Sequence, residues 1–254
     1  MDSFFEQSKL VNAYDVDLNN KLKLNALFNF LQDAASSHAE SLNLGFNDLI
    51  ANDLGWVLSW VKVQIEEYPG FGETIKIRTW PKCRYKLYSI REFIIYNSTG
   101  KVLYRVSTAW LLINVKTKRI TDIKNLPQQI FYQPDVYALN EYPEKITPLN
   151  KKEIVFSKKI RYTDLDINQH VNNTQYIELI LDCYSIEQHK NNHLKGLTVS
   201  FISESFYHDE IEISFAHEGF HEKFDVIEGV NKKSSKKVFQ ALVEWEPMAM
   251  KKYS

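Results

Sequence analysis

The polar side chains best suited to chemistry gather in one short segment, residues 164–171, where Asp166, Asn168 and His170 alternate with other residues. In an extended strand, side chains two positions apart lie on one face, so a carboxylate, an amide and an imidazole would converge. An imidazole titrates near neutral pH, and a carboxamide can donate a hydrogen bond to a carbonyl oxygen. The segment leads into a predicted helix, whose first N–H groups could stabilise an oxyanion. The combination suits proton transfer with polarisation of a carbonyl group.

This segment allows two other interpretations. Aspartate and asparagine before a helix often serve as caps or turn residues, and that role alone would explain them. A calcium loop of the EF-hand type is excluded, because Gln169 stands where that loop requires glycine and Gln175 where it requires glutamate. No cysteine or histidine spacing typical of a metal site occurs, so we predict no metal and no other cofactor.

An internal repeat favours the chemical interpretation. Residues 15–19 recur at 164–168 with the same two aspartates and the same asparagine, but Lys21 stands where the second copy has His170. The shared residues can be structural in both copies, whereas the titratable group is present in one. Further matches follow in the same order: Leu22 with Val171, Phe28 with Ile177, Leu31 with Ile180, residues 72–77 with 208–213, and Trp110 with Trp245. We therefore predict a duplicated fold in which the second copy carries the chemistry.

Each copy follows the same plan of an extended segment, one helix and several long strands. Apolar residues at helical spacing predict the helices near residues 24–35 and 176–184, and alternation predicts the strands. The strands are expected at 55–67, 73–80, 87–97 and 102–114, and then at 196–204, 210–217, 223–229 and 237–246. This is an α+β fold, and a helix wrapped by a long antiparallel sheet is the hotdog arrangement. We expect an N-terminal copy at 1–115, a proline-bearing linker at 116–149 and a C-terminal copy at 150–254.

Composition excludes several classes of protein. The 254 residues hold 31 basic and 32 acidic side chains, a net charge of −1, which argues against a nucleic-acid binder. No apolar run approaches the ~18 residues of a spanning helix, so we expect no membrane insertion. Two cysteines cannot form a disulfide framework, so we expect a reducing compartment, the cytoplasm.

Residues 164–177 resemble the signature of the acyl-acyl-carrier-protein (acyl-ACP) thioesterases, in their bacterial branch. The likeness covers nearly the whole chain, because residues 21–45, 56–80, 91–93 and 107–110 also resemble that family. The resemblance implies a tandem (double) hotdog fold. It also implies hydrolysis of the thioester that joins a fatty acyl chain to acyl carrier protein.

The resemblance places four catalytic residues at Asp166, Asn168, His170 and Glu204. In our hypothesis Glu204, with His170, activates a water, while Asn168 and helix amides hold the carbonyl group and Asp166 orients its neighbours. Strand alternation puts Glu204 in phase with Thr198, so a bulge or a strand end would have to turn it toward the site.

A cysteine nucleophile is disfavoured by the same comparison. Plant members carry a cysteine after the glutamate, and this chain has Ser205 there. Neither Cys83 nor Cys183 falls at a matching position.

Other predictions concern recognition. Lys82, Arg84 and Lys86 could attract an acidic carrier protein, although such a cluster is more often a solvated loop. Trp56 and Trp60 could line an acyl pocket in the first copy, although core packing is the default for such residues.

Three further functions stay open. An acyl-CoA thioesterase of the hotdog superfamily would use the same chemistry on another carrier. A non-catalytic module that binds acyl chains or carrier protein is less compatible with His170 in one copy alone. A hotdog dehydratase would pair a histidine with an acid for a different reaction, and the extended motif fits it poorly. The sequence is also compatible with a homodimer. His38 is expected at the surface of the first helix, and Asn172 and Asn173 as cap residues of the second.

Overall fold

The computed structural model describes residues 3–139, 141–147, 152–217 and 224–247. The chain divides into two compact units, Met1–Glu144 and Lys145–Ser254. The predicted linker is therefore shared between them, and as far as Glu144 it belongs to the first unit. The predicted boundary between residues 149 and 150 lies outside the described residues. None of the described helices has the length and apolar character needed to cross a membrane.

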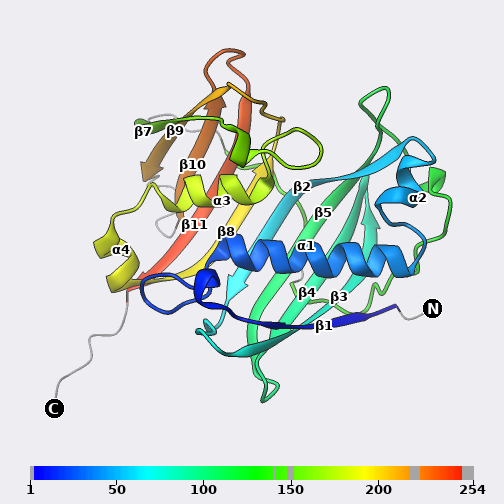
Figure 1. The fold of residues 1–254 in the computed structure, drawn as a ribbon, viewed down its shortest axis with the longest axis horizontal. Helices are drawn as coiled ribbons and strands as arrows, with labels where there is room; N and C mark the ends of the chain where they lie inside the picture. The colour runs from blue at the N-terminus through cyan, green and yellow to red at the C-terminus, as the bar shows by residue number, and fades with distance from the viewer. Residues whose placement is uncertain (1–2, 140, 148–151, 218–223, 248–254) are drawn as a thin grey trace. The chain divides into compact units, whose positions relative to one another are not determined.

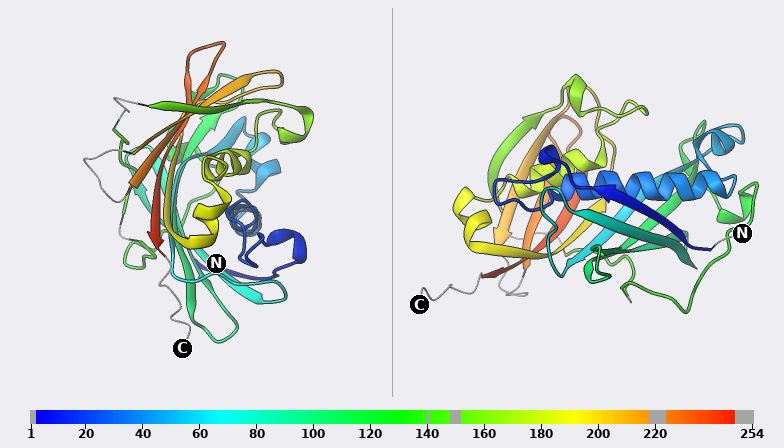
Figure 2. Two further views of the ribbon diagram at one scale, coloured as in Figure 1. Left: turned by 90° about the vertical axis from the view of Figure 1, so that its left-hand side faces the viewer. Right: turned by 60° about the horizontal axis from the view of Figure 1, so that its bottom comes forward.

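The first unit is an antiparallel sheet with one long helix, α1, across a face (Figures 1 and 2). Its described strands run in the order β1-β3-β4-β5-β2, and β6 pairs with β5. The elements are β1 Phe5–Leu10, α1 Leu24–Ser41, α2 Phe46–Ile50, β2 Leu54–Ile65, β3 Thr74–Tyr85, β4 Tyr88–Tyr96, β5 Val102–Asn114 and β6 Arg119–Ile120.

The second unit repeats this topology. Its described strands run β7-β9-β10-β11-β8, again antiparallel, with α3 as the counterpart of α1. The elements are β7 Glu153–Lys159, α3 Asn173–Leu181, α4 Ile186–Asn191, β8 Asn192–Phe201, β9 Glu210–His217, β10 Phe224–Asn231 and β11 Lys237–Pro247. Even an unusual backbone position recurs: Gly72 and His208, just before β3 and β9, both have positive φ, 82° and 69°. The predicted duplication is confirmed.

Helix α1 forms where the sequence predicts it. Its buried side chains recur at intervals of three and four residues, which puts them on the side that faces the core. They are Leu24, Ala26, Leu27, Phe28, Leu31, Ala34, Ala35 and His38. Helix α3 is shorter than predicted and ends at Leu181. Tyr184 therefore lies beyond the helix, where its ring contacts Trp245 edge-on at 5.0 Å.

The predicted long strands are confirmed, with shifted ends. Strands β5 and β9 span the expected residues, whereas β8 starts earlier and stops at Phe201, before Glu204. In β2 the pairing register shifts between Leu58 and Trp60. This bulge moves side chains on its two sides to opposite phases, which affects the predicted acyl pocket below.

Candidate active site

The segment 164–171 is a closed turn, so our prediction of an extended strand was wrong. The Asp166 N–H donates to the His170 carbonyl at 2.9 Å, and Leu165 pairs with Val171 in an isolated bridge. Gln169 closes the turn with φ of 65°, a left-handed conformation uncommon for glutamine. The alternation of polar and apolar residues comes from this turn and does not come from a pleated strand.

The Asp166 carboxylate stabilises the turn. Its Oδ1 accepts a hydrogen bond from the Asn168 backbone N–H at 2.8 Å. The Asn168 side chain is exposed and is available to a ligand at the tip of the turn. Asp166 therefore holds the backbone of the turn, and its role in orienting the catalytic groups stays a prediction.

His170 and Glu204 meet across two loops. The distance from His170 Nε2 to Glu204 Oε2 is 3.5 Å, and their side chains are 21% and 40% exposed. Glu204 lies beyond the end of β8, so a strand end turns it toward His170, one of the two predicted routes. The loops are joined by a hydrogen bond from the Val171 N–H to the Ser205 carbonyl at 3.0 Å. The edge of the Phe206 ring contacts the imidazole at 5.4 Å. The result is an acid–base pair open to water on one side.

The start of α3 is capped by its own residues. Asn172, predicted as a cap, accepts from the Thr174 N–H at 2.9 Å through its side chain and from the Gln175 N–H at 2.9 Å through its carbonyl. These two helix amides are therefore occupied. An oxyanion would depend more on Asn168 than our hypothesis assumed.

The first unit contains the same turn without the acid–base pair. The Asp17 N–H donates to the Lys21 carbonyl at 2.8 Å, and Asp17 Oδ1 accepts from the Asn19 N–H at 2.8 Å. The Leu22 N–H donates to the Pro69 carbonyl at 3.0 Å, as Val171 does to Ser205. By this register Lys21 and Tyr68 stand where His170 and Glu204 stand in the second unit.

The replaced pair makes a different contact. The Lys21 ammonium lies 5.2 Å from the centroid of the Tyr68 ring, a cation–π distance. Burial lowers the pKa of Lys21, an effect that the carboxylate of Asp17 opposes. Burial, and then Asp17, raise the pKa of the Tyr68 phenol. The Tyr68 phenol therefore stays protonated near neutral pH and cannot act as a base in place of the Glu204 carboxylate.

The two cysteines are poor nucleophiles. Burial raises the pKa of the Cys183 thiol to about 12, with the Asp182 carboxylate adding to the effect. Burial also raises the pKa of Cys83, against smaller opposing effects of Tyr142 and Lys82. The thiolate is the reactive form, so both thiols are largely unreactive at neutral pH.

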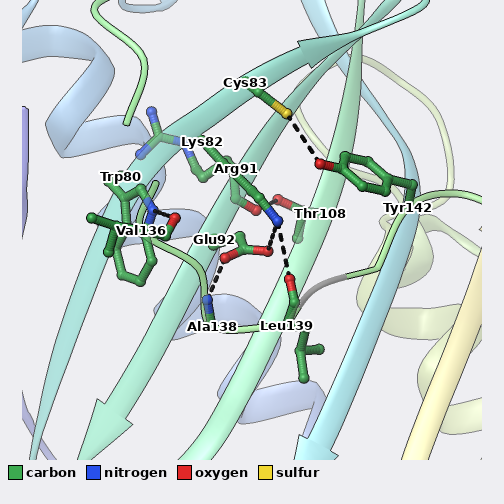
Figure 3. A network of polar contacts seen from close by, with 10 residues as sticks. All are labelled: Trp80, Lys82, Cys83, Arg91, Glu92, Thr108, Val136, Ala138, Leu139 and Tyr142. Carbon is green, nitrogen blue, oxygen red and sulfur yellow. Dashed lines mark hydrogen bonds and ion pairs between the residues drawn. The ribbon is translucent and has the colours of Figure 1, made fainter. Parts of the chain in front are cut away.

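Lys82 is not available for a carrier protein, which corrects our prediction. Its side chain is 2% exposed and its ammonium lies 3.3 Å from the carboxylate of Glu92, itself completely buried (Figure 3). Lys82 also donates to the Leu139 carbonyl at 3.2 Å, and the Ala138 N–H donates to Glu92. Residues 138 and 139, which we predicted to be part of a linker, therefore cover Lys82, which we predicted to lie near a loop.

The other two residues of the predicted basic cluster are exposed. Arg84 pairs with Asp122 at 2.8 Å, and Lys86 lies in a turn with φ of 55°. Both remain accessible to a charged partner.

Trp56 and Trp60 belong to different parts of the core. Trp56 pairs with Leu112 and packs with Leu44, Leu49 and Leu54, whereas Trp60 pairs with Ala109 and packs with Ile90, Cys83 and Tyr142. Positions 109 and 112 of one continuous strand face opposite sides of a sheet, so the bulge turns the two indoles apart. The prediction that both line one pocket was wrong.

His38 is buried, contrary to our expectation. It is 1% exposed because it continues the apolar side of α1, and its Nδ1 lies 3.0 Å from Arg91 Nη1. Its ring stacks on Phe5 at 5.6 Å. Burial lowers the pKa of Arg91 to about 10, while nearby Tyr132 opposes the shift.

The described residues contain no group of three or more histidine, cysteine, aspartate or glutamate side chains arranged to hold a metal ion. The site is thus described by its protein groups: an imidazole, a carboxylate, an exposed carboxamide and a supporting aspartate.

Comparison with solved structures gives similarity along the whole chain. A crystal structure of an acyl-ACP thioesterase from Bacteroides thetaiotaomicron matches with a TM-score of 0.87 and 26% identity, covering 96% of this chain and 98% of that one. The 12:0-ACP thioesterase from Umbellularia californica has the same fold, with a TM-score of 0.80, 21% identity and coverage of 98% and 99%.

Sequence comparison with curated proteins also finds acyl-ACP thioesterases. The chloroplastic palmitoyl-acyl carrier protein thioesterase of Arabidopsis thaliana is 26% identical over 213 residues, which are 78% of this chain and 51% of that protein. This chain spans about half the length of the curated relatives it matches. Two family models match it, the acyl-ACP thioesterase N-terminal domain at residues 2–129 and the C-terminal domain at residues 149–247. With both of its halves matched in order, the chain is a double hotdog protein that belongs to the acyl-ACP thioesterase family.

Proposed function

We propose that this protein hydrolyses fatty acyl-ACP to a free fatty acid and carrier-protein thiol. The observation that carries the proposal is the His170–Glu204 pair, 3.5 Å apart, in the unit whose twin holds Lys21 and Tyr68 on the same backbone turn. The two turns share their backbone hydrogen bonds, so the turn itself does not require an imidazole and a carboxylate at these positions. Family membership supplies the substrate class.

The reaction follows from these groups. Glu204, with His170, takes a proton from a water molecule as the water oxygen attacks the thioester carbonyl carbon. The Asn168 carboxamide donates a hydrogen bond to the carbonyl oxygen as negative charge develops on it. When the resulting tetrahedral intermediate collapses, the C–S bond breaks, and the proton held by Glu204 and His170 passes to the thiolate sulfur. Asp166 keeps the turn closed and does not touch the substrate.

Two recognition roles belong to the first unit. We propose that it holds the acyl chain, with Trp56 as a lining residue and Trp60 excluded by its place on the other face. Arg84 and Lys86 are proposed to attract the acidic carrier protein, and Lys82 is excluded by burial. Raised salt should then weaken hydrolysis of acyl-ACP more than that of acyl-CoA.

The direct test is hydrolysis of acyl-ACP and acyl-CoA thioesters over a series of chain lengths. His170→Ala and Glu204→Gln should each lower kcat by about 100- to 10,000-fold, the usual range for acid–base groups. Ser205→Ala, in the same assay, tests a serine nucleophile, and it should keep far more activity than Glu204→Gln. A wild-type protein that hydrolyses none of the thioesters would refute the enzyme proposal and leave a binding module. Hydrolysis of acyl-CoA but not of acyl-ACP would show that the carrier of the substrate is coenzyme A and not acyl carrier protein.

A further inference from the structure

Two buried hydroxyl groups, those of Tyr176 and Ser205, lie near Glu204. Tyr176 is 3% exposed and Ser205 is completely buried. Neither hydroxyl oxygen has a well-formed hydrogen bond to any described residue. A buried hydroxyl without a well-formed hydrogen bond contributes little to stability or reduces it, which points to another role for these two groups.

Both hydroxyls belong to the segments that carry the reactive pair. Tyr176 lies on α3, which begins after the His170 turn, and its ring contacts the rings of Phe201 at 6.2 Å and Phe239 at 5.4 Å. Ser205 follows Glu204, and its carbonyl accepts the Val171 N–H that joins the two loops. The Tyr176 phenol, on the helix that follows one loop, is close enough to interact with the Ser205 side chain on the other.

The electrostatics agree with this placement. Burial raises the pKa of the Tyr176 phenol, and the nearby charges of Asp209, Glu204 and Asp166 add to the effect. The Ser205 hydroxyl is near enough to act in the opposite direction. The phenol thus stays protonated, and it can donate toward Ser205 and the carboxylate side of the site.

The first unit shows that the fold needs neither hydroxyl. By the register of the shared turn, Leu27 stands where Tyr176 stands and Pro69 where Ser205 stands. Leu27 is completely buried, so an apolar side chain packs well at this position. The two hydroxyls are present in the unit that has the acid–base pair and absent from the unit that lacks it.

We propose that Tyr176, acting through Ser205, is a positioning residue that sets the Glu204 loop against the His170 loop for hydrolysis. This inference rests on the function proposed above. It assigns Tyr176 no contact with the substrate.

The test is Tyr176→Phe, which removes one oxygen and keeps the ring. We expect kcat on acyl-ACP to fall about 10-fold, below the ~100-fold that a 1 Å misplacement can cause, with KM within about twofold of wild type. The acid limb of the pH–rate profile should also shift, and thermal stability should stay equal or rise. Ser205→Ala should have a similar effect, and the double variant should lose little more, because the two hydroxyls act as one unit.

The matched control is Tyr104→Phe in the first unit. The Tyr104 hydroxyl is also buried without a well-formed hydrogen bond to the described residues, so the chemical change is the same away from the pair. It should leave kcat and the pH profile unchanged.

Three outcomes would count against these ideas, and they are distinguishable. An inactive wild-type protein overturns the proposed function. An active wild type with an unchanged kcat and pH profile in Tyr176→Phe overturns the positioning role alone. Loss of stability and of kcat together in both tyrosine variants would show that the hydroxyl is structural, and would also overturn it.

Discussion

Replacing Glu92 with alanine should destabilise the first unit strongly, because it leaves a buried ammonium without its counter-ion. Among the described residues, Lys82 would keep the Leu139 carbonyl at 3.2 Å and the faces of Tyr137 and Tyr142 at 5.5 and 5.0 Å. The Ala138 N–H would lose its acceptor as well. Removing one partner of a buried ion pair typically costs about 3–5 kcal/mol.

The penalty should depend on pH. An unpaired lysine can escape by losing its proton, which costs about 1.4 kcal/mol for each pH unit below the ordinary lysine pKa of about 10.4. That route limits the loss from the ammonium to about 5 kcal/mol at pH 7 and to about 2 kcal/mol at pH 9. The destabilisation of Glu92→Ala relative to wild type should therefore shrink as the pH rises.

Urea unfolding of wild type and Glu92→Ala at pH 7 and pH 9 measures the loss of unfolding free energy at each pH. The control is Glu141→Ala, which breaks the pair with Lys62 in the same unit, where the side chains are 50% and 30% exposed. An exposed pair contributes less than about 1 kcal/mol, and its loss should not vary over this pH range. The reasoning fails if the free energy of unfolding of Glu92→Ala is within about 1 kcal/mol of the wild-type value at pH 7. It also fails if the loss of unfolding free energy is as large at pH 9 as at pH 7.

Other consequences can be checked separately. Because burial raises the pKa of Cys183 to about 12, alkylation by iodoacetamide at pH 8 should be slow in the folded protein, fast in urea, and faster as the pH rises; rapid native labelling at pH 8 would contradict this. Asn172→Ala removes the side-chain cap of α3 and should cost about 1 kcal/mol in urea unfolding, whereas Asn172→Asp should keep most of it. Gly229→Ala should lower the melting temperature, because the new Cβ would lie 2.3 Å from the Phe239 ring; Gly100→Ala, whose Cβ meets open space, would suffer only the strain of its positive φ of 85°. Equal effects of the two glycine variants would show that the Phe239 contact relaxes freely.

The repeat made much of the fold readable from sequence. Two similar polar segments, each followed by a helix and long strands, predicted two copies of one topology, which the strand orders β1-β3-β4-β5-β2 and β7-β9-β10-β11-β8 confirm. The predicted site residues His170 and Glu204 lie together, at a strand end that alternation alone could not place.

Local turn geometry was not readable in the same way. The alternating residues 164–171 imitate a strand, and nothing about Gln169 as a residue type announces a left-handed conformation. Pairings distant in sequence were also out of reach. Lys82 resembles a surface lysine until Glu92 on the next strand and the backbone of residues 138 and 139 close over it.

The sequence does contain a signal for the two buried hydroxyls. Aligning the two copies pairs Tyr176 with Leu27 and Ser205 with Pro69, in the same way that it pairs His170 with Lys21. The two hydroxyls, like the imidazole, are therefore differences between otherwise similar copies, and such differences around the motif point to the residues of the candidate site.

The recurring turn also bears on how this chain can change over evolutionary time. In both units the turn is held by main-chain hydrogen bonds and by one aspartate carboxylate, at 2.8 Å to Asn19 in one and to Asn168 in the other. The side chains of His170 and Glu204, which we propose to carry the reaction, take no part in those hydrogen bonds, so selection can act on them separately from the turn. The turn of the first unit, which has the same backbone without the His170–Glu204 pair, is a place where a new activity could arise by a few substitutions while the second unit keeps its own residues.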